Sequence, residues 1–155
     1  MRDKRFIAEH RGGLLKKEQH RQLMQWGCNC AENVLSLYGK EIDKRLKNAI
    51  TVGKEWIKGN ASVGNARDAS SKAHTVARES SNPTSTAVAR SVGHAVATAH
   101  MADHSLGAAF YALKAVRSAG KSIELERKWQ NEQLPIEIMD LVLTARNKKE
   151  KRLKI

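Results

Sequence analysis

Apolar residues recur every three or four positions along most of the chain, which is the spacing of one face of an α-helix. The pattern is clearest between residues 18 and 38, where the recurring residues are Leu23, Trp26, Cys30, Val34 and Leu37. No segment alternates apolar and polar residues over a sustained length, so the sequence predicts no β-strands. The pattern indicates an all-α protein, built as a compact bundle of about six to eight helices.

Glycine, proline and helix-capping residues divide this pattern into segments. The predicted helices span approximately residues 3–10, 18–38, 42–58, 63–80, 84–119, 122–134 and the residues from 135 onward. Because a helix rises about 1.5 Å per residue, the segment 84–119 is too long for one helix in a domain of this size. We therefore place a break near residues 102–107, with Asp103 or Ser105 capping the second half. Asn82 and Pro83 are typical of an N-cap followed by proline in the first turn.

The length of 155 residues suits one domain with a core of its own, without disulfides or metals. We expect a single helical domain over residues 1–146 and a separate basic C-terminal tail over residues 147–155. The tail, NKKEKRLKI, offers few apolar side chains for burial. We therefore expect it to be frayed or disordered and to add little to the stability of the fold.

The net charge of +12 is concentrated toward the two ends of the chain. Such an excess attracts acidic partners, whether protein, nucleic acid or lipid. Nucleic acid could be bound through the basic ends, but the chain has no helix-turn-helix or RNA-binding signature and few aromatic residues for base stacking. Solvation of the helix surfaces is the simpler interpretation of these charges.

Three features favour a cytoplasmic protein that does not enter a membrane. The longest stretch without Lys, Arg or Glu, residues 91–113, contains Asp103 and three histidines, which are costly in hydrocarbon. The charged N-terminal residues are not followed by the apolar segment of a secretory signal peptide. Cys28 and Cys30, the only cysteines, point in divergent directions on a helix, so we expect neither a disulfide nor a zinc site.

Three histidines stand in the otherwise apolar stretch GHAVATAHMADH, residues 93–104. Together with one histidine of the preceding helix, the set is His74, His94, His100 and His104. In the interpretation that we favour, they form a structural network, in which each ring makes hydrogen bonds inside a core of small side chains.

A metal site is the alternative interpretation of the same stretch. Its candidate ligands are His74, His100, Asp103 and His104, because His100 and His104 are four positions apart and would share a helical face. Met101 follows His100, so the glutamate of an HExxH motif is missing, and no ExxH pattern occurs. The pair also falls close to the predicted break, where the helical spacing is interrupted.

No catalytic residues and no cofactor are expected. The chain has no GxSxG, P-loop or GxGxxG motif. Ser105 lies next to His104 and near Asp103, but the members of a catalytic triad converge from separate elements rather than from adjacent positions.

Four blocks of the sequence carry a family resemblance: CNCAENVLSLYG, DKRLKNAITVGKEWIKGNASVGNARDASSKAHTVARE, ARSVGHAVATAHMADHSLGAAFYALKAV and ERKWQNEQLP. Over roughly residues 3–135 the chain resembles immunity proteins of bacterial toxin systems, in particular an all-helical group with an alanine-rich GHAVATAH-type helix pair. The resemblance implies a small cytoplasmic protein that binds and neutralises a cognate toxin and has no catalytic residues. Immunity proteins against nucleases are often acidic, so the basic charge of this chain argues against a nuclease target.

Two other functions stay open at this point. One is a basic helical protein that associates with nucleic acid, and the other is an enzyme with a histidine-based metal site. The oligomeric state is open as well, a homodimer included.

Overall fold

Seven α-helices make up most of the part of the chain described by the computed structural model, which is residues 3–39 and 41–153. They are α1 (Lys17–Asn33), α2 (Lys44–Ile57), α3 (Val63–Glu79), α4 (Pro83–Ala97), α5 (His104–Ser118), α6 (Ile123–Glu132) and α7 (Ile136–Leu153). Short 3₁₀ turns occur at Lys4–Phe6, Glu9–Arg11 and Leu35–Leu37, and the described residues contain no β-strand. The predicted all-α class and the predicted number of helices are confirmed.

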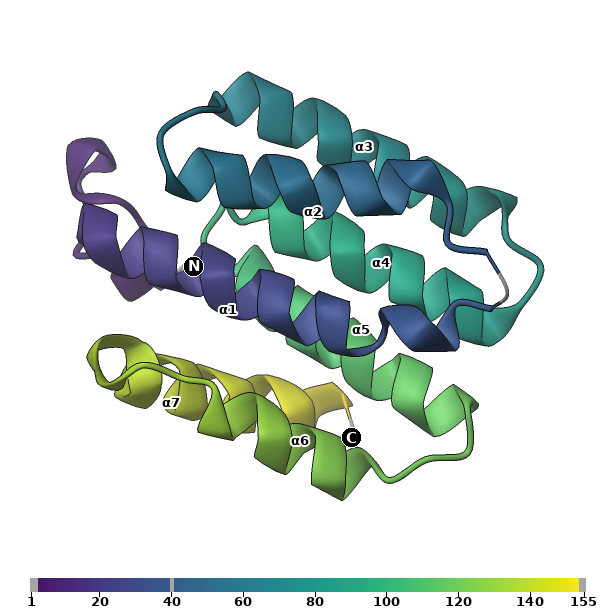
Figure 1. Ribbon diagram of the computed structural model, residues 1–155. Helices are drawn as coiled ribbons and strands as arrows, with labels where there is room; N and C mark the ends of the chain where they lie inside the picture. Colours follow the sequence, from purple (N-terminus) through teal and green to yellow (C-terminus); the bar gives the residue numbers. More distant parts are fainter. Residues whose placement is uncertain (1–2, 40, 154–155) are drawn as a thin grey trace.

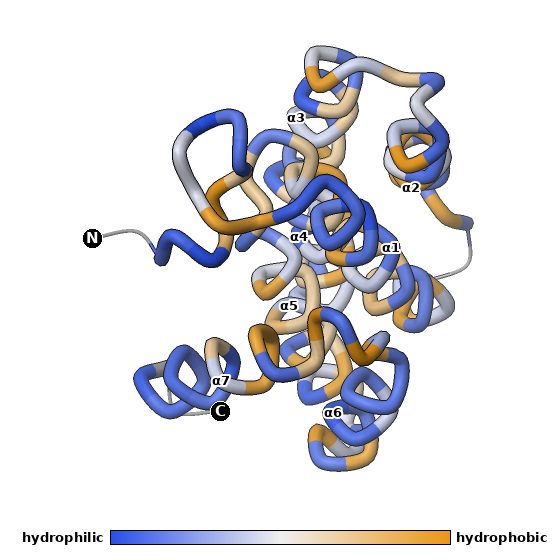
Figure 2. Tube along the Cα trace, turned by 90° about the vertical axis from the view of Figure 1, so that its left-hand side faces the viewer, coloured by the Kyte–Doolittle hydropathy of each residue, from blue (hydrophilic) through white to orange (hydrophobic). Residues whose placement is uncertain are grey.

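The helices α4 and α5 form the centre of the bundle. Helices α2 and α3 lie on one side of this pair, and α6 and α7 lie on the other (Figures 1 and 2). Helix α1 packs against both α4 and α5, so that it joins the two halves of the core. Within the described residues, none of the helices combines the length and the apolar composition that crossing a membrane requires.

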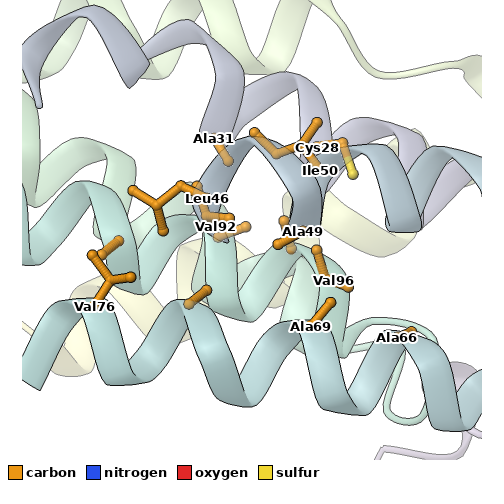
Figure 3. Packing of buried hydrophobic residues seen from close by; sticks show 14 of the residues in the cluster. Cys28, Ala31, Leu46, Ala49, Ile50, Ala66, Ala69, Val76, Val92 and Val96 are labelled. Carbon is orange, nitrogen blue, oxygen red and sulfur yellow. The ribbon is translucent and has the colours of Figure 1, made fainter. Parts of the chain in front are cut away.

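Small side chains allow the central helices to approach closely. The residues buried between α1, α2, α3 and α4 are mostly alanine and valine, with Leu46 and Ile50 contributed by α2 (Figure 3). Hydroxyl groups bridge neighbouring backbones here: Ser70 donates to the carbonyl of Gly93 at 2.8 Å, and Ser91 donates to the carbonyl of Ala108 at 2.7 Å. These bonds satisfy polar groups that have no access to water.

The break between α4 and α5 comes earlier than predicted. Helix α4 ends at Ala97 and α5 begins at His104, so the connection covers residues 98–103. Asp103 occupies the N-cap position, but its side chain accepts no hydrogen bond from the first turn of α5. Ser105 donates to the carbonyl of Ala102 at 2.8 Å instead of capping the helix. The predicted capping role of these two side chains is therefore wrong, whereas the predicted cap by Asn82 is confirmed.

The N-terminal segment forms a hook rather than the single helix predicted for residues 3–10. We define the hook as residues 3–16. Leu15 forms an isolated parallel bridge with Ala8: its amide donates to the carbonyl of Ile7 at 2.9 Å, and its carbonyl accepts from the amide of Glu9 at 3.1 Å. A Cβ at Gly13 would lie 1.9 Å from the carbonyl oxygen of Ile7, so only glycine allows the chain to fold back here. The backbone bonds of Leu15 to Ile7 and Glu9 therefore replace the helix that the sequence predicts over residues 3–10.

The predicted domain boundary at residue 146 falls inside α7, which continues to Leu153. Arg146 and Glu150 are 3% and 8% exposed, and the Arg146 Nε donates to Glu150 Oε1 at 2.8 Å. Arg127 on α6 donates to the other oxygen of Glu150 at 3.1 Å. Residues 147–153 continue α7, with Glu150 buried against the two arginines, while residues 154–155 lie outside the described residues. The frayed tail expected over residues 147–155 stays a prediction.

Candidate functional site

The four histidines singled out from the sequence form one continuous chain of ring contacts. We call this set, His74, His94, His104 and His100, the histidine chain. The ring centroids of His74 on α3 and His94 on α4 are 5.2 Å apart, and those of His94 and His104 on α5 are also 5.2 Å apart. His100, in the connection between α4 and α5, follows at 5.4 Å from His104.

Hydrogen bonds restrict the proton positions at one end of this chain. The Arg90 Nη1 lies 2.7 Å from Nδ1 of His74. Because a guanidinium can only donate, Nδ1 of His74 accepts, and the ring carries its proton on Nε2. The Nδ1 atoms of His94 and His104 lie 3.2 Å apart, so one of these two nitrogens must carry the proton of the bond.

The surroundings favour neutral rings at His74 and His94. Burial, followed by the positive charge of Arg90, lowers the pKa of His74 to about 4. Burial, followed by the neighbouring His104 and His74, lowers the pKa of His94 to about 3. The ring of His94 also stacks on Tyr111, with centroids 5.1 Å apart. Neither ring titrates near neutral pH, which is where a histidine acting as general base is usually poised.

Two glycines make room for these rings. A Cβ at Gly93 would lie 2.6 Å from Nε2 of His74, and a Cβ at Gly107 would lie 2.7 Å from Nδ1 of His94. At Gly107 the clash includes the Cβ of His94, at 3.3 Å, which rotation of the ring cannot relieve. The ring of His74 is thus packed against the backbone of α4 at Gly93, and that of His94 against the backbone of α5 at Gly107.

The residues proposed as metal ligands do not form a recognisable cation site. Among residues 3–39 and 41–153, no group of three or more His, Cys, Asp or Glu side chains is placed to hold a metal ion. At His74 the guanidinium of Arg90 bonds to Nδ1, and its positive charge opposes the approach of a cation. The structure brings His100 and His104 into ring contact and places Asp103 beside them at the start of α5. The metal interpretation stays a prediction that elemental analysis can test.

A cavity of about 620 Å³ opens where the histidine chain ends. We call it the hook pocket, because the N-terminal hook supplies one wall. The first turns of α1, the end of α2, the loop between α2 and α3, and the connection between α4 and α5 supply the others. His100 belongs to both the pocket lining and the histidine chain.

Histidine and tryptophan side chains shape the inner part of the hook pocket. The Nε2 of His20 donates to the carbonyl of Thr98 at 2.6 Å, which ties α1 to the end of α4. The His20 ring also packs against Trp56, with centroids 4.9 Å apart. Sequence reasoning missed this pocket because its lining comes from three distant stretches of the chain, residues 6–21, 56–63 and 99–102, and only the basic N-terminal residues indicated it.

Three side chains that could act as nucleophiles, Cys28, Cys30 and Ser105, are buried. Burial raises the pKa of the Cys28 thiol to about 12 and also raises the pKa of Cys30. Both thiols are therefore protonated at neutral pH, and the two cysteines are free and buried. The hydroxyl of Ser105 is buried and donates to a backbone carbonyl.

Comparison with known proteins gives one match. A family model described as Imm-5 like putative immunity protein matches residues 13–137. The matched range contains the histidine chain and the helices α1 to α6. No curated protein and no solved structure matches the chain.

Proposed function

The chain belongs to the Imm-5 like family of immunity proteins, and we propose that it binds and neutralises a cognate bacterial toxin without catalysing a reaction. The family resemblance drawn from the sequence is confirmed by this membership. The match over residues 13–137 is the observation that carries the proposal. The proposal places the protein in the cytoplasm and gives it a protein partner.

The chemistry of the histidine chain supports binding rather than catalysis. His74 and His94 have strongly lowered pKa values, and both thiols have raised ones. These groups stay uncharged at neutral pH and are bonded or packed inside the bundle. In this proposal the histidine chain holds α3, α4 and α5 in register, so that the surface of the bundle is rigid before it meets the toxin. A rigid surface lowers the entropic cost of association.

The charge of the protein supports a partner with an acidic surface. The net charge of +12 attracts negative potential and raises the rate of encounter with an acidic protein. A stable complex would cover about 800 Å² on each partner.

Co-expression tests the proposal. The toxin domain encoded beside the gene of this protein is expressed in a bacterial host, alone and together with the protein. We expect growth to stop with the toxin domain alone and to be restored by the protein, and we expect the two proteins to be purified as a complex. An unrelated helical protein of similar positive charge serves as the control and should not restore growth. Failure of the protein to restore growth would contradict the proposal.

Two other expectations from the sequence, association with nucleic acid and a homodimer, can be tested by separate measurements. Association with nucleic acid would show binding that falls steeply with salt concentration. A homodimer would be seen in the mass of the free protein in solution. Neither is supported by a specific feature of the described residues.

A further inference from the structure

The hook pocket combines apolar walls with positive charge. Phe6 and Leu15 of the hook are buried in its wall, and Trp56 is half-buried at the end of α2. Val63, also in the lining, is 41% exposed, so part of the apolar surface is open to solvent. The charged residues of the lining are Arg11, Lys17 and Arg21 against the single carboxylate of Glu9, and its histidines are His10, His20 and His100.

The three cations of the pocket lie together without a carboxylate of the described residues bound to any of them. Some cations elsewhere are bound to carboxylates: Arg5 to Asp3, Arg45 to Asp43 and Glu79, Lys54 to Glu32, and Arg127 and Arg146 to Glu150. Within the described residues, the side chains of Arg11, Lys17 and Arg21 form no ion pair and no hydrogen bond. Their charges are thus available to groups of another molecule.

We infer that the hook pocket receives an acidic segment of the toxin, whose carboxylates pair with Arg11, Lys17 and Arg21 while one apolar side chain enters the cavity. The inference rests on the proposed function, since it names the part of the surface that the toxin contacts. The cavity of about 620 Å³ lies within the range of pockets that enclose a compact ligand group. A large anchor side chain seated in a well-packed pocket is the usual form of an interface hot spot, and complementary charges around it favour the correct partner.

The apolar walls favour a protein segment over nucleic acid. Stacking of bases needs an open aromatic face, and the ring of Trp56 is already covered in part by His20, with centroids 4.9 Å apart.

Charge reversal tests the role of the cations. The double variant Arg11→Glu, Arg21→Glu changes two residues of the pocket, and Arg117→Glu, Lys121→Glu is the matched control. The control residues are exposed and lie where α5 ends and its loop to α6 begins, at the opposite end of the bundle from the hook (Figure 1). Both variants change the net charge equally. We expect the pocket variant to weaken binding of the co-expressed toxin domain by ~10- to 100-fold, and the control by less than about threefold.

Filling the cavity tests the role of the anchor. Ala61 lines the pocket and lies in the loop before α3, so Ala61→Trp should occupy the cavity without disturbing the core. Ala119→Trp, at an exposed position at the end of α5, is its control. We expect only Ala61→Trp to abolish growth rescue. Circular dichroism and thermal melting of the free proteins show whether each variant is folded.

A photo-crosslinking amino acid at position 61 then identifies the occupant. We expect it to capture a toxin peptide with an apolar residue flanked by Asp or Glu. A complex that tolerates all the pocket variants, or a captured peptide that is basic, would overturn the inference and leave the proposed function standing. Binding of a single-stranded oligonucleotide at the pocket, in competition with the toxin domain, would also overturn it. Absence of any complex with the wild-type protein would overturn the proposed function and the inference together.

Discussion

Replacing Glu150 with alanine removes the carboxylate that two arginines share between α6 and α7. Glu150 accepts from Nε of Arg146 at 2.8 Å and from Nε of Arg127 at 3.1 Å. Arg146 is 3% exposed and also donates to Gln130 at 2.6 Å and to Asn131 at 2.8 Å. The variant therefore leaves a buried guanidinium with its hydrogen bonds to the two amides and without its counter-charge.

The magnitude follows from this arrangement. Removal of one partner of a buried ion pair costs about 3–5 kcal/mol, because the other charge is left uncompensated. The bonds that Arg146 keeps to Gln130 and Asn131 reduce this cost, and Glu150 lies close enough to the surface for water to take part of its place. We expect Glu150→Ala to lower the free energy of unfolding by about 2–3 kcal/mol, which corresponds to roughly 4–12 °C in Tm for a domain of this size.

Urea unfolding followed by circular dichroism measures this difference. Asp140→Ala is the matched control, since Asp140 is an exposed carboxylate on the same helix, and we expect it to change the stability by less than about 0.5 kcal/mol. A Glu150→Ala protein as stable as Asp140→Ala would refute the reasoning. It would show that residues 147–153 behave as the independent tail expected from the sequence.

Three further predictions concern the histidine chain. Gly107→Ala should destabilise the protein by ~1–3 kcal/mol, because its Cβ would lie 2.7 Å from Nδ1 of His94. Gly64→Ala is the control: its Cβ would meet only Ser62 Oγ, at 3.6 Å, so it should be neutral or stabilising in the same denaturation assay. The pKa of His94 is lowered to about 3 in the folded protein, whereas a histidine in the unfolded chain has a pKa of about 6.5. Below about pH 6.5 the unfolded chain therefore binds more protons than the folded protein, and the stability present at pH 7 is progressively lost as the pH falls. Between pH 7 and 5 we expect a loss of at most about 2 kcal/mol from His94, with a smaller contribution from half-buried His74; equal stability at both pH values would contradict this account. Elemental analysis of protein purified without metal-affinity steps should show no stoichiometric metal, whereas metal present in the wild type and lost from a His100→Ala, His104→Ala variant would support the metal interpretation instead.

The parts of the fold that depend on local signals could be predicted from the sequence. Asn82 and Pro83 begin α4 because a side-chain cap and a fixed φ act within one turn. Gly12 and Gly120 end their segments at positive φ, of 85° and 75°, where glycine has no steric penalty.

The parts that depend on distant contacts could not be predicted. The hook of residues 3–16 exists because Leu15 bonds back to Ile7 and Glu9, and nothing in the local pattern of residues 3–10 indicates this. Glu150 lies among lysines and arginines in the segment that the sequence predicts to be frayed or disordered, and its partner Arg127 is 23 positions away. The sequence indicates the four histidines as one set, but their order of contact depends on how three helices pack.

Stoichiometric titration of the toxin tests the central claim most directly, because it separates neutralisation by binding from neutralisation by a reaction. The purified toxin domain is mixed with increasing amounts of this protein, and both its residual toxicity and its mass are measured. We predict that inhibition is complete at a fixed stoichiometric ratio and that the toxin domain recovered from the complex has an unchanged mass and regains its toxicity. Inactivation of many toxin molecules by one molecule of this protein, with a covalent change in the toxin, would contradict the claim.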